Sequence, residues 1–130
     1  MGNVDYDSDR VLNEYLLFHY GLPDEILSKS HGPKEGLGFP VRTVSELLDS
    51  NTFAPSSCRA LDLGCAVGRS SFELARNCTD VVAVDYSATF IRAAKTLRDS
   101  GELSFGFPSQ GERKVLSVAR VPLGVDSSRV

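Results

Sequence analysis

The feature that most constrains the fold of this chain is a succession of short apolar runs and turns between residues 59 and 84. Residues 59–63 (RALDL) predict a strand, residues 64–68 (GCAVG) a glycine-flanked turn, and residues 69–76 a helix. Residues 81–84 (VVAV) are mostly β-branched and lack polar alternation, as buried parallel strands do. Strand, turn, helix and strand together predict a doubly wound α/β sheet with a crossover helix.

The second of these strands is followed by an acid and a further helix. Asp85 comes directly after the strand, and residues 88–100 predict a helix capped by Ser87 and terminated by Gly101. After Gly101 the pattern weakens, and it predicts one more strand at residues 115–121. Because two parallel strands cannot shield their own faces, we expect residues 51–130 to be the first part of a truncated domain.

Residues 1–50 predict a helical lead-in and a loop ahead of that domain. Residues 8–20 have an amphipathic pattern, with Asp7 or Ser8 as the cap and a stop at Gly21. Residues 21–40 are rich in glycine and proline and predict a connector with one helical turn within 24–30. A capping box formed by Thr43 and Glu46 predicts a helix that starts there, ends near Asn51 and turns Val44, Leu47 and Leu48 inward.

Composition excludes several function classes. The chain of 130 residues has a net charge of -3, which argues against general nucleic-acid binding and against a polybasic membrane surface. No apolar run approaches the roughly 20 residues that a membrane span needs. The cysteines, Cys58, Cys65 and Cys78, are odd in number and form no CxxC pair, so we expect neither a disulfide framework nor a metal site. We expect Cys58 and Cys78 to be structural and the location to be cytoplasmic.

The turn after the first strand has the composition of a ligand-binding loop. Gly64 and Gly68 flank it, and a ligand that lies across a strand tip and a helix start touches backbone, where side chains are obstacles. With Asp62 before it, the run 61–68 (LDLGCAVG) resembles motif I of the class I S-adenosylmethionine-dependent methyltransferases. Ala66 replaces the middle glycine of that motif. We expect Cys65 to be a small apolar filler among the cofactor-binding positions.

This resemblance implies S-adenosylmethionine as cofactor and an acid that accepts both ribose hydroxyls. Asp85 stands where such folds place that acid, and Tyr86 after it is in position to lie against the adenine. The predicted cofactor-binding residues are Asp62, Gly64, Cys65, Ala66, Gly68, Asp85 and Tyr86. No catalytic residue is predicted; a role for His19 or Tyr20 over the cofactor is an open alternative to a place in the core.

A narrower resemblance covers most of the chain, about residues 6–101, and extends more loosely through residues 125–130. The segments 15–21 (YLLFHYG), 39–42 (FPVR) and 59–74 are similar to the carboxy-terminal methyltransferase domain of ovothiol synthases. The resemblance implies transfer of the sulfonium methyl to a ring nitrogen of 4-mercaptohistidine, and a sulfoxide synthase module as partner. It also implies that the acceptor pocket comes from segments beyond Val130, so we expect low activity from this chain alone.

Three alternatives remain open. A dinucleotide (NAD or FAD) fold would need glycines at Ala66 and Arg69, and arginine does not suit the close helix–strand packing there. In a purely structural interpretation the glycines only shape the turn, and Asp85 caps the next helix. A non-catalytic copy would pair with another chain through the open sheet edge.

Overall fold

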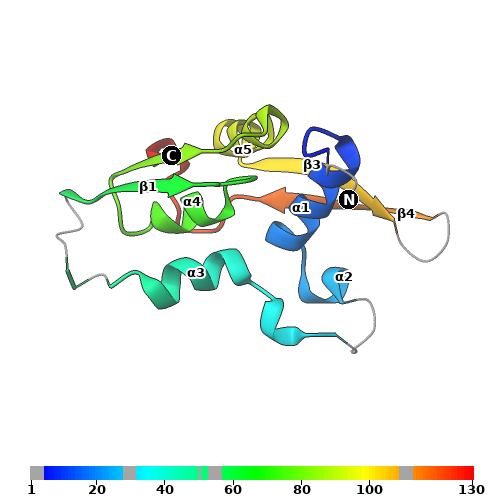
Figure 1. The fold of residues 1–130 in the computed structure, drawn as a ribbon, viewed down its shortest axis with the longest axis horizontal. Coiled ribbons are helices and arrows are strands. Elements are labelled where there is room, and N and C mark those ends of the chain that lie inside the picture. Colours follow the sequence, from blue (N-terminus) through cyan, green and yellow to red (C-terminus); the bar gives the residue numbers. More distant parts are fainter. Residues whose placement is uncertain (1–4, 28–31, 50, 53–56, 109–112) are drawn as a thin grey trace.

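The structure, a computed structural model, describes residues 5–27, 32–49, 51–52, 57–108 and 113–130 (Figure 1). Of the helical turn predicted within residues 24–30, residues 28–30 lie outside this part. The elements in chain order are α1 (Asp9–Tyr20), α2 (Pro23–Ile26), η1 (Lys34–Gly36), α3 (Phe39–Leu47), β1 (Arg59–Leu63), α4 (Arg69–Leu74), β2 (Asp80–Val84), α5 (Ala88–Ser100), β3 (Glu102–Pro108), β4 (Lys114–Arg120) and η3 (Ser127–Arg129).

The α/β unit predicted from the sequence is present. β1 and β2 pair in parallel, from Arg59 opposite Asp80 to Leu63 opposite Val84, with α4 between them in the chain. The Ser87 side chain accepts from the Phe90 backbone N–H at the start of α5, and Gly101 ends that helix in the left-handed region. The α/β fold class is therefore confirmed.

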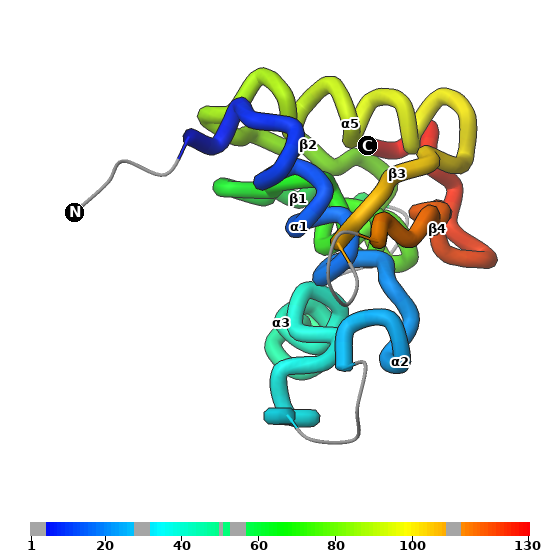
Figure 2. Tube along the Cα trace, turned by 90° about the vertical axis from the view of Figure 1, so that its right-hand side faces the viewer, coloured from blue at the N-terminus to red at the C-terminus, as the bar shows by residue number. Residues whose placement is uncertain are grey.

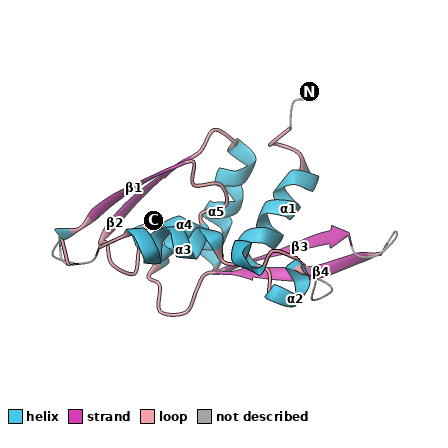
Figure 3. Ribbon diagram, turned by 60° about the horizontal axis from the view of Figure 1, so that its bottom comes forward, coloured by secondary structure: helices cyan, strands magenta, loops and turns pink. Residues whose placement is uncertain are grey.

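A second sheet follows α5, and half of it was not predicted. β3 and β4 form an antiparallel pair, so the single strand expected at residues 115–121 has a partner (Figure 3). Phe105 and Phe107 alternate inward along β3, but Gly106 and Pro108 interrupt the run, and these residues favour a loop interpretation. The described residues thus contain two two-stranded sheets rather than two strands alone.

The main core lies between α1, α4, α5 and the β3–β4 hairpin. Leu16 from α1, Phe72 from α4 and Leu97 from α5 are almost wholly buried there, with Phe105 and Ala119 from the hairpin. Figure 2 shows α5 along the top of this arrangement and α3 at the bottom. Because α1 contacts both strands of the hairpin, the amino-terminal helix is part of the packed core. The boundary placed at residue 50 stays a prediction.

The helix predicted to begin at Thr43 begins four residues earlier. α3 starts at Phe39, and Pro40 lies in its first turn, where proline is favoured. Thr43 is therefore inside the helix, and its Oγ1 donates to the Phe39 carbonyl at 2.9 Å. Glu46 pairs with Arg42, so the capping box is wrong, and so is the inward placement of Leu47, which is 78% exposed.

The two parallel strands are buried on one face only. Val81 is buried, whereas Leu61, Leu63, Val82 and Val84 are exposed. The expectation of strands buried on both sides is therefore wrong for the described residues. Helix α4 and the carboxy-terminal residues Val125 and Val130 pack on one side, and no described element buries Leu61, Leu63, Val82 or Val84 on the other.

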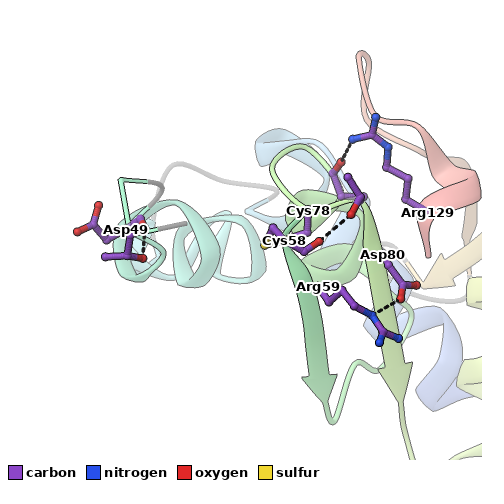
Figure 4. The surroundings of a disulfide bond; sticks show 9 residues. Asp49, Cys58, Arg59, Cys78, Asp80 and Arg129 are labelled. Carbon is purple, nitrogen blue, oxygen red and sulfur yellow. Dashed lines mark hydrogen bonds and ion pairs between the residues drawn. A yellow bond between two sulfur atoms is a disulfide. The ribbon is translucent and has the colours of Figure 1, made fainter. Parts of the chain in front are cut away.

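A disulfide joins Cys58, just before β1, to Cys78, just before β2 (Figure 4). The odd cysteine count led us to expect no disulfide framework, and this pair corrects that expectation. The structural role expected for both residues stands, since each is buried in a small cluster with Ala75 and Val81.

Candidate functional site

The loop after β1 and the acid after β2 meet at the carboxyl ends of the two strands. The Gly64 and Cys65 backbone N–H groups both donate to the Val84 carbonyl, at 2.8 and 3.0 Å. The Ala66 N–H donates to Asp85 Oδ2 at 2.8 Å, and the Ser87 N–H donates to Asp85 Oδ1 at 2.9 Å. The Asp85 carboxylate thus holds the loop next to the start of α5.

Three loop residues have left-handed backbone conformations. Gly64 has φ of 77° and Gly68 has φ of 82°, whereas Ala66, at 47°, is the one positive-φ residue other than glycine in the described part of the chain. A Cβ added at Gly64 would meet no atom within 4 Å. At Gly68 it would lie 3.1 Å from Ala94 Cβ, so this glycine lets the loop approach α5 closely.

Asp62 and Cys65 are held by partners inside the chain. The Ser71 hydroxyl donates to Asp62 Oδ2 at 2.6 Å. Cys65 is 3% exposed, and burial, with the charges of Asp62 and Asp85, raises the pKa of its thiol to about 12. A thiol this far from ionisation is a poor nucleophile, so the chemistry at this end of the sheet does not depend on Cys65.

Two cavities flank the loop, and both are lined by Tyr15, Gly64 and Ala66. The Asp85 cavity, of about 280 Å³, is also lined by Tyr6, Asp85, Tyr86, Ser87 and Phe90. The His19 cavity, of about 420 Å³, lies between the loop and the helices α1 and α3, and contains Asp62, Cys65, His19 and Phe39 in its wall. Both have sizes typical of small-molecule sites or parts of them.

An aromatic cluster that was not predicted forms one side of the Asp85 cavity. The Tyr15 and Phe90 rings lie 4.5 Å apart between centroids, and Tyr6 contacts both at 6.4 and 6.2 Å. Asp7 fixes this segment, because its Oδ1 accepts from Ser87 Oγ at 2.9 Å and from the Thr89 N–H at 3.3 Å. These hydrogen bonds lower the pKa of Asp7, Ser87 contributing most. The sequence contains no local pattern that predicts contacts between Asp7 and residues about 80 positions further along the chain.

His19 and Tyr20, at the end of α1, differ in whether their side-chain polar atoms have hydrogen-bond partners. The Tyr20 hydroxyl donates to the Val67 carbonyl at 2.9 Å, and burial raises the pKa of Tyr20. Nδ1 of His19 is buried and finds no hydrogen-bond partner among the described residues. Burial, with the nearby Arg69 charge as a smaller cause, lowers the pKa of His19 to about 4. The imidazole is therefore neutral near pH 7.

The structure brings the predicted residues together at one edge of the sheet. Gly64, Ala66 and Asp85 line the Asp85 cavity with Tyr86, whose side chain is 99% exposed. Asp62 and Cys65 line the His19 cavity. Gly68 instead packs against α5. In the purely structural interpretation Asp85 caps α5, but the cap is the Ser87 side chain; Asp85 accepts from the Ser87 N–H just before the helix.

Residues 60–111 match the family model of a methyltransferase domain. The match supports a class I S-adenosylmethionine-dependent methyltransferase. The matched residues run from Ala60 in β1 through α4, β2, α5 and β3, and their mixed α/β architecture is consistent with part of a Rossmann-like methyltransferase fold. No curated protein sequence matches the chain. Within the described residues, no helix is long and apolar enough to cross a membrane, and no cluster of metal-ligating side chains is found.

The Asp85 cavity has room and polar groups for the cofactor that such domains usually bind. Each Asp85 oxygen accepts one backbone N–H, and a carboxylate offers about four lone-pair sites, so capacity for two vicinal hydroxyls remains. The space beside Gly64 is open to a ligand that touches backbone. An adenosine-bearing sulfonium compound fits this donor and acceptor set.

Proposed function

We propose that this chain is a methyltransferase domain that binds S-adenosylmethionine and methylates a ring nitrogen of 4-mercaptohistidine, as the ovothiol-synthase domain that it resembles does. The observation that carries the proposal is the 2.8 Å hydrogen bond from Ala66 to Asp85, because it unites the loop of one strand with the acid of the next. When bound, the cofactor supplies an activated methyl group on a sulfonium centre.

The residues of the chain contribute binding and alignment. Asp85 accepts sugar hydroxyls, Gly64 leaves room beside the backbone, and Tyr86 offers a ring at the mouth of the Asp85 cavity. Asp62, Cys65, Ala66 and Gly68 shape the loop around these contacts. Such enzymes gain rate chiefly by holding the reactants in line within a site that excludes water, which the aromatic walls favour.

The same proposal includes a mercaptohistidine-like acceptor, a sulfoxide synthase module as partner, and a cytoplasmic location. The Cys58–Cys78 disulfide is more typical of oxidising compartments than of the cytoplasm. A dinucleotide-binding role is less favoured, because Arg69 stands where close packing would need glycine. Its side chain is only 14% exposed and pairs with Glu73.

Calorimetry with S-adenosylhomocysteine and with NAD tests the proposal. The chain should bind S-adenosylhomocysteine and not NAD, and Asp85→Asn should weaken binding by about tenfold or more, because charge-assisted hydrogen bonds are lost. Asp80→Asn is the matched control: it makes the same change at the opposite end of the same strand and should leave the affinity unchanged. Binding of NAD alone, or equal effects of both substitutions, would contradict the proposal. Methylation of 4-mercaptohistidine then tests the acceptor.

A further inference from the structure

The His19 cavity has two chemically different walls. One wall comes from the strand end and loop and contains Asp62, Gly64 and Ala66. The other comes from α1 and α3 and contains Phe18, His19 and Phe39. Since Gly64 and Ala66 also line the Asp85 cavity, the loop wall is continuous with the place proposed for the cofactor, and the helical wall faces it across the cavity.

The helical wall is aromatic and incompletely buried. Phe18 is 40% exposed and Phe39 is 59% exposed, which is more than packing inside a core would leave. Contacts elsewhere fix the two helices in place: Ser70 Oγ donates to the Pro40 carbonyl at 3.2 Å, and Leu16 anchors α1 in the main core, where it is 1% exposed. Exposed aromatic rings on a fixed wall favour a flat ligand that can lie against them.

His19 is the polar member of this wall. Its Nδ1 is buried and has no hydrogen-bond partner among the described residues. A buried, unpaired polar atom is costly, so its retention calls for an explanation. A neutral imidazole has one donor and one acceptor, the same pair that another imidazole-type ring presents.

We infer that the His19 cavity is the methyl-acceptor pocket and takes a planar, nitrogen-containing heteroaromatic ring, with His19 as the residue that positions it. This inference rests on the proposed function and goes beyond it, because it assigns the acceptor to residues within this chain. The resemblance to ovothiol synthases implied instead an acceptor pocket formed by segments beyond Val130. His19 orients the ring by hydrogen bonding, and Phe18 and Phe39 contact its faces.

Binding measurements separate the acceptor from the cofactor. In calorimetry with the full chain, 4-mercaptohistidine is titrated in the presence of saturating S-adenosylhomocysteine, and S-adenosylhomocysteine is titrated alone. His19→Phe keeps a planar side chain but removes both nitrogens. It should weaken 4-mercaptohistidine binding by about tenfold and change S-adenosylhomocysteine affinity by less than about twofold. His19→Asn restores a donor and an acceptor and should recover part of the loss.

Tyr20→Phe is the control for a purely structural effect. It removes one polar group from the same helix end, where the hydroxyl bonds to Val67 and does not line the His19 cavity. It should leave acceptor affinity unchanged. Equal losses for both ligands in His19→Phe, or no loss for either, would overturn the inference. If the native chain binds S-adenosylhomocysteine but not 4-mercaptohistidine, the inference fails and the cofactor assignment stands; if it binds neither, both fail.

Discussion

The two ends of the β1–β2 pair differ in how their polar and reactive groups are used. At the amino end, a disulfide joins Cys58 to Cys78, and Thr79 donates to the Cys58 carbonyl through both its N–H and its hydroxyl, at 2.8 and 2.9 Å (Figure 4). Arg59 pairs with Asp80 across the strands at 2.6 Å. At the carboxyl end, Asp85 has spare acceptor capacity, and Gly64 lies beside open space.

This difference separates stability from binding. The groups at the amino end satisfy one another, and one of their links is covalent, so a ligand has little to gain there. The carboxyl end has unused hydrogen-bonding capacity, left-handed backbone and two adjoining cavities, which are the properties of ligand sites at the carboxyl edge of α/β sheets. Substitutions at the amino end should therefore change the free energy of unfolding, and those at the carboxyl end should change affinity.

Removal of the disulfide should have the largest effect. Cys58→Ser with Cys78→Ser frees a loop with a sequence separation of 20 residues and should lower the free energy of unfolding by about 3 kcal/mol. Affinity for S-adenosylhomocysteine should not change. Urea denaturation and calorimetry measure the two quantities. Cys65→Ala, at the one cysteine outside the disulfide, should show a smaller loss of stability. A large loss of affinity in the double variant would contradict the assignment of stability to the amino end and of binding to the carboxyl end.

Acidification should act through the carboxyl end. Because the pKa of His19 is lowered to about 4, the unfolded chain binds a proton between pH 6.5 and 4 that the folded chain excludes. The contribution of neutral His19 is complete above pH 6.5 and is lost as the pH falls, by about 2 to 3 kcal/mol at pH 4.5. Urea denaturation at several pH values measures this slope. His19→Phe should remove it, and an unchanged slope would show that other groups carry the acid sensitivity.

How much could be predicted from the sequence depended on how local each signal was. The segments from β1 to α5 were predicted closely, because glycines, caps and apolar runs lie within or beside the elements that they define. The Ser87 cap and the Gly101 terminator are examples. The predicted start of α3 at Thr43 was wrong. Thr43 and Glu46 have the spacing of a capping box, but Pro40 favours a helix start before them, and the helix begins at Phe39.

The remaining features depend on tertiary contacts. Asp7 reaches Ser87, and Tyr15 reaches Phe90, only because α1 packs beside α5, and no spacing rule encodes such packing. Pairing of Cys58 with Cys78 likewise depends on the parallel register that brings the starts of β1 and β2 together. The candidate site residues of the loop were predicted from its glycines together with the resemblance to motif I; the aromatic and histidine walls of the two cavities required the fold.

The two glycines of the loop sharpen the comparison within the carboxyl end itself. Alanine at Gly68 adds a Cβ 3.1 Å from Ala94 Cβ and 3.4 Å from the Phe72 ring, besides the strain of a positive φ. Gly68→Ala should therefore cost about 2 kcal/mol of stability. Gly64→Ala meets no neighbour, so it should cost about 1 kcal/mol, yet weaken S-adenosylhomocysteine binding by about tenfold. Urea denaturation and calorimetry on both variants measure the loss of stability and the loss of affinity. A larger loss of affinity in Gly68→Ala than in Gly64→Ala would place the ligand near Gly68.

The ion pair at the amino end should have the smallest effect. Arg59 and Asp80 are close, at 2.6 Å, but their side chains are 76% and 48% exposed, so water and salt screen their attraction. Arg59→Gln should cost less than about 1 kcal/mol of unfolding free energy, and 1 M NaCl should remove the difference from the native chain. Urea denaturation at low and high salt measures this, with Asp80→Asn completing a double-mutant cycle. If the coupling energy between Arg59 and Asp80 were as large as the loss of stability on removing the disulfide, the ion pair would be a main source of stability at the amino end. If the disulfide is the main source, loss of Arg59 should change stability little.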